Sequence, residues 1–167
     1  MVSGATRLAA VVGDPIRHSL SPAILNAAFE AAGLDWLYVA FQVPEGEGRA
    51  AVDAVRTLGL GGLSVTMPHK AVAAAACDEL TGVAKALGAA NCLYWQGTTL
   101  CGDNTDGAGF LDALRLDEGI DPAGARCVIV GAGGAGRAVA HALGEADAGR
   151  VVIVNRSPGP AEHAARL

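Results

Sequence analysis

Residues 127–136 read Cys-Val-Ile-Val-Gly-Ala-Gly-Gly-Ala-Gly, an apolar run that passes directly into a glycine-rich turn. The apolar run predicts a buried strand, and the residues that follow it, 137–143, have the composition of a helix. A second apolar run, Val-Val-Ile-Val at 151–154, predicts another buried strand. Strand, glycine turn, helix and strand in this order predict a βαβ unit and an α/β fold.

A glycine turn in this context indicates a dinucleotide site. Such a turn lets backbone N–H groups approach a pyrophosphate at the N-terminus of the following helix. A chain with 23 glycines in 167 residues also produces this spacing by chance, so a purely structural turn is the alternative. The residues expected to line the pyrophosphate are Gly131, Ala132, Gly133, Gly134, Ala135 and Gly136.

The residues after the second strand indicate which dinucleotide is bound. NAD-binding proteins place an Asp or Glu there to hold the ribose 2′-hydroxyl. This chain has Asn155, Arg156 and Ser157 instead. A guanidinium with neutral neighbours suits a 2′-phosphate, which a carboxylate would repel. The sequence therefore favours NADP over NAD, with a solvated Arg156 as the alternative.

Composition excludes several other classes of protein. Hydrophobic residues make up 51% of the chain and the mean hydropathy is +0.36, which is typical of a globular protein. No apolar stretch is long enough to cross a membrane, and the first residues lack a signal peptide. The net charge is −5 and the basic residues are scattered, so we expect no nucleic-acid partner.

The four cysteines form no C-x-x-C pair and no cluster with histidine at the spacing of a zinc site. We expect reduced thiols, no metal, and a cytoplasmic location.

The rest of the chain also alternates strands with helices. Ser21 and Pro22 are expected at the N-cap and first position of the first helix, and Gly33 and Gly59 are expected to end two helices. The alternation predicts an α/β architecture with largely parallel sheets and a boundary near 106–109. The expected strands are 8–13, 36–43, 63–66, 89–95 and 98–102, and the expected helices are 23–32, 50–58, a segment that begins at 70, and 107–116.

Three polar clusters lie at the expected ends of these strands, where open α/β sheets bind ligands. They are residues 18–22, residues 64–70, and Asn91 together with 104–106. Hydroxyls beside a helix start can hold a carboxylate, and a lysine, an amide and a carboxylate can bracket alcohol or carbonyl oxygens. The clusters therefore fit a small anionic polyol.

Each cluster also has an ordinary structural interpretation. Ser19 and Ser21 would simply cap a helix, Lys70 would be a solvated residue in a first turn, and Asp106 would cap the next helix. His18 and His69 are expected to bond to local backbone. From the residue types alone, the prediction ends at an NADP-linked enzyme for a small polar substrate.

In combination and in this order, the three clusters, the glycine turn and residues 155–157 resemble shikimate dehydrogenase. That family reduces 3-dehydroshikimate to shikimate with NADPH, in the route to chorismate and the aromatic amino acids. The resemblance implies a three-layer α/β substrate domain with a mainly parallel sheet at 1–106. The first part of a Rossmann-type NADP-binding domain would follow at 107–167.

The resemblance also implies a role for individual residues. Ser19 and Ser21 match hydroxyls that bind the substrate carboxylate, and Lys70 and Asp106 match the catalytic lysine and its acidic partner. The groups that match contacts to the ring hydroxyls are Thr66, Asn91 and Asp106. Those that match contacts to the adenosine phosphate are Asn155, Arg156 and Ser157. The implied partner is a small-molecule substrate, without nucleic acid or membrane, in a monomer or homodimer.

The chain departs from the family pattern at two residues and in length. Ser64 replaces the usual Asn, which opens the identity of the ring acid, and Cys92 replaces a common Thr. Family members run on well past the length of this chain. The alternatives are an NAD-dependent quinate/shikimate dehydrogenase and a truncated, non-catalytic ligand-binding module.

Overall fold

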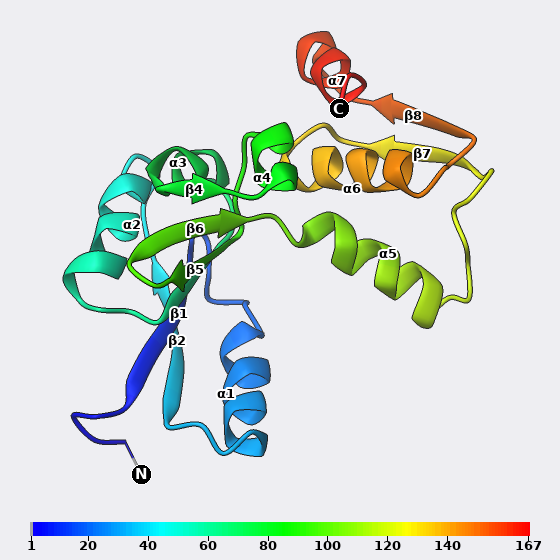
Figure 1. The fold of residues 1–167 in the computed structure, drawn as a ribbon. Helices are drawn as coiled ribbons and strands as arrows, with labels where there is room; N and C mark the ends of the chain where they lie inside the picture. Colours follow the sequence, from blue (N-terminus) through cyan, green and yellow to red (C-terminus); the bar gives the residue numbers. More distant parts are fainter. Residues whose placement is uncertain (1) are drawn as a thin grey trace. The chain divides into compact units, whose positions relative to one another are not determined.

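The computed structural model describes residues 2–167, and the chain divides into two compact units. The first unit runs to Asp103 and the second from Asn104 to Leu167, each with a sheet of its own (Figure 1). This division follows backbone contacts. The assignment of residues 1–106 to a substrate and 107–167 to a cofactor stays a prediction.

The first unit is built on a six-stranded mixed sheet in the order β2-β1-β3-β5-β6-β4. β1 pairs in parallel with β2 and β3, and β6 with β4, whereas β5 is antiparallel to both of its neighbours. Three of the five pairings are therefore parallel. The strands are β1 (Arg7–Gly13), β2 (Trp36–Gln42), β3 (Gly62–Val65), β4 (Glu79–Leu80), β5 (Cys92–Gln96) and β6 (Thr99–Asp103).

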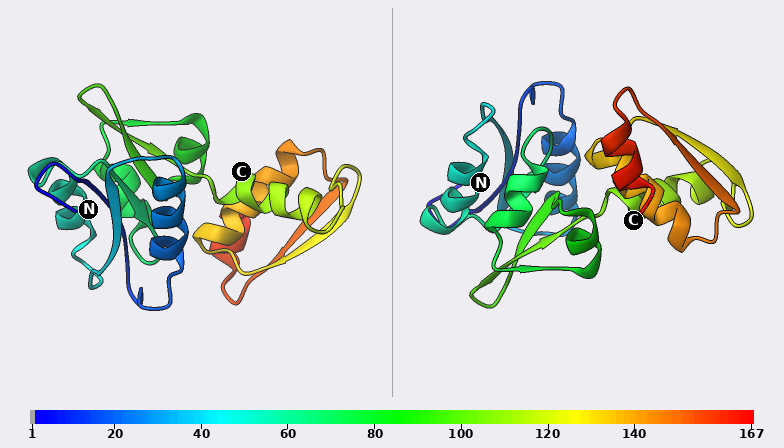
Figure 2. Two further views of the ribbon diagram at one scale, coloured as in Figure 1. Left: turned by 90° about the horizontal axis from the view of Figure 1, so that it is seen from below. Right: turned by 90° about the horizontal axis from the view of Figure 1, so that it is seen from above.

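Helices cover both faces of this sheet, as the two sides of β1 show. Ala10 and Val12 lie in a core cluster with residues of α2 and α3, while Ala9 and Val11 lie in a cluster against α1. Successive residues of a strand point to opposite faces, so an apolar run buried on both sides requires two helix layers. The predicted three-layer α/β fold is thus confirmed (Figure 2). The helices are α1 (Ser21–Ala31), α2 (Gly48–Thr57), α3 (Lys70–Ala76) and α4 (Gly82–Leu87).

Two glycines end helices as predicted. Gly33 and Gly59 both have φ +65°. The N–H of Leu34 donates to the carbonyl of Phe29, and that of Leu60 donates to Val55, as in a Schellman motif. The predicted N-cap of α1 is wrong by one residue, because Leu20 occupies that position and Ser21 is already helical.

The second unit contains the βαβ unit that the glycine turn predicted. Its two strands pair in parallel, with α6 between them in the sequence. Gly107 of α5 lies against α6 so closely that a Cβ there would meet the Ala138 carbonyl and the Ala142 side chain. The elements are α5 (Asp106–Leu116), β7 (Arg126–Val130), α6 (Gly134–Glu145), β8 (Arg150–Val154) and α7 (Pro158–Ala164).

The two-stranded sheet of this unit is buried less completely than the sheet of the first unit. Residues of β7 and β8 alternate between half-buried and exposed, and Val128 and Val130 are 67% and 85% exposed. One face of the strands therefore remains accessible in this chain. Within residues 2–167, no helix is long and apolar enough to cross a membrane.

Candidate substrate and cofactor sites

In the first unit, the turns after β1 and β3 lie against each other. The N–H of Asp14 donates to the carbonyl of Met67 at 2.9 Å, and that of Thr66 donates to Val12 at 2.9 Å. Gly13 permits this approach, because a Cβ there would overlap the methyl group of Thr66. The cluster at 64–70 is therefore fixed beside the loop that leads to Ser19 and Ser21.

Backbone hydrogen bonds also bring Lys70 and Asn91 to this edge of the sheet. The carbonyl of Lys70, the first residue of α3, accepts the N–H of Ala90 at 2.9 Å. The carbonyl of Asn91 accepts the N–H of Val65 at 2.8 Å, and its own N–H donates to Asp103 at 2.9 Å. Residues far apart in sequence thus share one end of the sheet, as the motif order predicted.

The two serines lie at the start of α1. The N–H of Ser19 donates to the Ile16 carbonyl at 2.9 Å, and the Ser19 hydroxyl accepts the N–H of Ser21 at 3.3 Å. Both residues are partly buried, and α1 has no side-chain cap. The hydroxyl of Ser19 therefore has a local structural partner, while that of Ser21 does not cap the helix.

A network that the sequence analysis missed holds α1 to β2. Asn26 Nδ2 donates to the carbonyls of Pro22 (2.7 Å) and Tyr38 (2.9 Å), while its Oδ1 accepts the N–H of Tyr38 at 2.8 Å. The Tyr38 hydroxyl donates to Ser64 Oγ at 2.6 Å, and burial raises the pKa of Tyr38 despite this bond. The available signal was the four-residue spacing from Pro22 to Asn26, a polar residue in the apolar stretch 22–29 of α1.

The two histidines of this region differ in burial. His69 is 3% exposed, and its Nε2 lies 2.8 Å from the Val43 carbonyl. A Cβ at Gly48 would collide with its ring, so glycine is needed there. His69 thus bonds to backbone as expected, but to a carbonyl 26 residues away instead of a local one, and His18 is exposed.

Asp106 belongs to the second unit, as the first residue of α5. It is partly buried, and its N–H donates to Asn104 Oδ1 at 3.2 Å. The N-cap of α5 is Thr105, without a side-chain cap, so Asp106 does not occupy the capping position that was its alternative role.

Two of the three motif glycines in the turn after β7 are needed for the local structure, and the third is not. Gly131 has φ +105°, a conformation that side chains disfavour. A Cβ at Gly136 would overlap the Gly131 carbonyl, so α6 can approach the strand only with glycine there. A Cβ at Gly133 would meet no protein atom within 4 Å. Nothing in the described part of the chain requires glycine at 133, which is the position where a dinucleotide fold lets pyrophosphate approach the backbone.

The segment after β8 lies next to this turn. The N–H of Gly131 donates to the Val154 carbonyl at 2.7 Å, and Asn155 Oδ1 accepts the N–H of Ala132 at 3.2 Å. Arg156 and Ser157 are exposed. The described geometry thus brings the two halves of the predicted cofactor site together.

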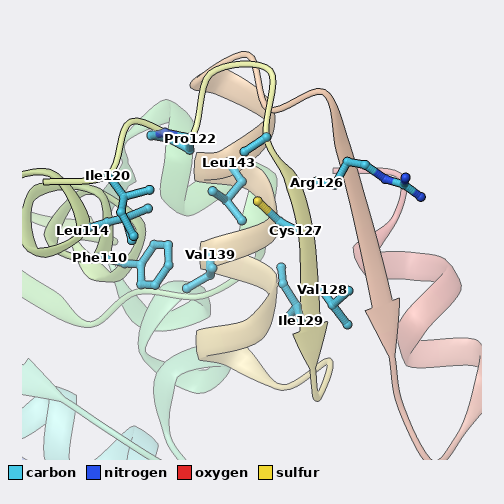
Figure 3. Close-up of a pocket in the computed structure, with 11 residues that line it drawn as sticks. Phe110, Leu114, Ile120, Pro122, Arg126, Cys127, Val128, Ile129, Val139 and Leu143 are labelled. Carbon is cyan, nitrogen blue, oxygen red and sulfur yellow. The ribbon is translucent and has the colours of Figure 1, made fainter. Parts of the chain in front are cut away.

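The second unit also has an apolar groove of about 460 Å³ between α5, α6 and β7 (Figure 3). Phe110 and Leu114 of α5 line it together with Val139 and Leu143 of α6. None of the predicted site residues lines this groove. Its lining is apolar apart from Arg126, and the groove is separate from the glycine turn and from residues 155–157.

Comparison with known proteins identifies the first unit. Residues 11–93 match the family model of the shikimate dehydrogenase substrate binding domain. A shikimate dehydrogenase (NADP(+)) of Geobacter metallireducens is 46% identical over 156 residues, which are 93% of this chain and 54% of that protein. The chain therefore spans about half the length of this relative.

Solved structures of the same family share the fold. A shikimate dehydrogenase in complex with NADP+ has a TM-score of 0.89 and 36% identity to this chain. The match covers 99% of this chain and 57% of that protein's chain. The enzyme of Thermus thermophilus in complex with NADP(H) and shikimate has a TM-score of 0.87 and 39% identity, with coverages of 96% and 60%. The chain, with its substrate-binding domain at 11–93 and its βαβ unit at 126–154, belongs to the shikimate dehydrogenase family.

Proposed function

We propose that this chain binds shikimate in its first unit and NADP in its second, and serves the reversible reduction of 3-dehydroshikimate to shikimate. The observation that carries the proposal is that two features occur in one chain. Residues 11–93 match the substrate binding domain of the family, and the glycine turn has a glycine at 133 that the fold itself does not require. The related Thermus thermophilus enzyme binds both NADP(H) and shikimate.

Substrate binding would use the edge of the sheet where β1 and β3 end. The hydroxyls of Ser19 and Ser21 would hold the carboxylate at the start of α1, because hydroxyl donors and a helix N-terminus both favour an anion. Thr66 and Asn91 would hold the ring hydroxyls. The Tyr38–Ser64 bond lies on the α1 side of β3 and would support this part of the site.

Lys70 and Asp106 would carry the proton chemistry. When bound, the nicotinamide supplies or accepts the hydride. Reduction of a carbonyl leaves negative charge on its oxygen, and the ammonium of Lys70 would stabilise that charge and donate the proton. Asp106 would orient the ammonium and a substrate hydroxyl. No metal ion is needed for these roles.

Cofactor binding would use the turn at 131–136 and the segment at 155–157. The first residues of α6 leave N–H groups without helical partners, which can bind the pyrophosphate. Arg156 would pair with the 2′-phosphate, and the absence of a carboxylate at 155–157 favours NADP over NAD.

Calorimetry of shikimate against the chain tests the substrate assignment. We expect binding by the wild type and a loss of affinity of roughly 100-fold or more in a Ser19→Ala, Ser21→Ala variant, since two hydrogen bonds to a charged group are removed. Lys70→Ala should retain binding yet lower turnover with NADP+ by roughly 10²–10⁴-fold. Ser3→Ala, at an exposed site remote from the sheet edge, is the control. Absence of shikimate binding by the wild type would refute the assignment.

A further inference from the structure

Asn155 occupies an unusual position, because its side chain joins the two halves of the proposed cofactor site. It follows β8 directly, and its Oδ1 accepts the N–H of Ala132 in the glycine turn at 3.2 Å. Its Nδ2 donates to the carbonyl of Ser157 at 2.9 Å. One amide group therefore bridges the turn that would receive the pyrophosphate and the loop that would receive the 2′-phosphate.

The polarity of both partners fixes the orientation of this amide. A backbone N–H can only donate and a carbonyl can only accept, so the oxygen must face Ala132 and the nitrogen must face Ser157. No other residue type of similar size offers both a donor and an acceptor in this arrangement. An aspartate would keep the bond to Ala132 and lose the one to Ser157.

We infer that Asn155 is a positioning residue, which holds the glycine turn and the Arg156 loop in place together. Its side-chain amide binds the backbone of these two segments and does not contact the adenosine phosphate. This inference rests on the proposed NADP site. It changes the role that family resemblance assigns to Asn155, while Arg156 keeps the contact to the 2′-phosphate.

The bridge also determines which N–H groups remain for the pyrophosphate. The N–H of Ala132 is already bonded to Asn155. The N-cap Gly133 and the first three residues of α6, Gly134, Ala135 and Gly136, are those whose N–H groups a helix leaves without helical partners. Asn155 thus holds the start of the turn in place while the anion binds one residue further along.

The test measures the binding of two probes that reach different parts of the site. Binding is monitored by NMR of the ¹⁵N-labelled chain. Inorganic pyrophosphate can occupy the turn alone, whereas adenosine 2′,5′-bisphosphate also reaches the Arg156 loop. Asn155→Ala should lower the affinity for both probes by roughly 3–10-fold, which is the usual effect of losing one hydrogen bond. Arg156→Ala, the matched control, should weaken only adenosine 2′,5′-bisphosphate, by roughly tenfold or more.

A measurement on the wild type keeps the inference testable if Asn155→Ala fails to fold. In the free protein, the amide of Ala132 should be protected from hydrogen exchange while that of Gly133 exchanges freely. Equal exchange of the two amides would overturn the inference.

The other outcomes separate this inference from the proposed function. If Asn155→Ala weakens adenosine 2′,5′-bisphosphate and leaves pyrophosphate unchanged, Asn155 contacts the adenosine phosphate directly and the inference is wrong. No effect on either probe would also overturn it. Failure of the wild type to bind either probe would refute the NADP site itself, and with it the role of Asn155.

Discussion

β1 in the first unit and β7 in the second are both apolar runs that follow an arginine, but their surroundings are very different. Residues 9–13 of β1 are all buried, whereas the residues of β7 alternate between half-buried and exposed. β1 pairs with a strand on each side and has helices on both faces. β7 pairs only with β8, and Val130 at its end is 85% exposed.

The comparison teaches that an apolar run specifies a strand but not the number of layers around it. Val and Ile favour strands, but the partners that cover each face of a strand come from elsewhere in the chain. Stability should therefore be concentrated in the first unit, where each substitution of a large side chain leaves a cavity enclosed on every side.

The largest effect is expected from a core substitution in the first unit. Leu93→Ala, at a side chain that is 1% exposed in β5, should lower the free energy of unfolding by roughly 2–5 kcal/mol. Val130→Ala, on the exposed face of β7, should change it by less than about 0.5 kcal/mol. Both tryptophans, Trp36 and Trp95, lie in the first unit, so their fluorescence in urea follows its unfolding, and amide exchange of β7 and β8 follows the second unit. Equal effects of the two substitutions would break the comparison.

A smaller effect is expected where α6 approaches β7. Gly136→Ala places a methyl group against the Gly131 carbonyl and should destabilise the second unit by roughly 1–3 kcal/mol. Gly133→Ala meets no protein atom and has φ −75°, so stability should stay within about 0.5 kcal/mol. Amide exchange of α6 measures the difference. A stable Gly136→Ala variant would show that the helix can move away from the strand.

The smallest effect concerns pH and the burial of Cys77 beside the core of the first unit. Burial raises the pKa of this thiol from 9.0 to about 11. The folded form then keeps a proton that the unfolded chain has lost, so stability is fully present below 9.0 and falls as the pH rises towards about 11. Urea unfolding at rising pH should show this loss, and Cys77→Ala should reduce it. An identical pH dependence in the variant would contradict the burial of the thiol.

Sequence patterns predicted the elements whose signals are local. The glycine turn, the βαβ order and the helix ends at Gly33 and Gly59 all depend on backbone conformations that glycine permits at low cost. The three-layer arrangement was expected from the family resemblance, and the burial of β1 on both faces agrees with it. The place of Thr66 and Lys70 after β3 follows the rule that ligands bind where parallel strands end. Asn91 reaches the same edge because β5, which it precedes, runs antiparallel to β3.

The elements that were missed depend on tertiary contacts. β4 has two residues and exists through its pairing with β6, and the short helices α4 and α7 carry little periodicity. The Asn26 network depends on β2 lying beside α1, which no local pattern specifies. The bridge at Asn155 likewise requires the turn after β7 and the loop after β8 to be neighbours.

Gly107 has a mechanical consequence for the proposed chemistry. Its missing side chain lets α5 lie directly on α6, and Asp106 is the residue immediately before it. Because α5 packs on α6 at Gly107, a movement of α6 would also move the Asp106 carboxylate. The glycine turn, which leads into α6, would move with them. The carboxylate proposed as the acidic partner of Lys70 therefore begins a helix that packs on α6, and the contact at Gly107 would link Asp106 to the proposed dinucleotide site.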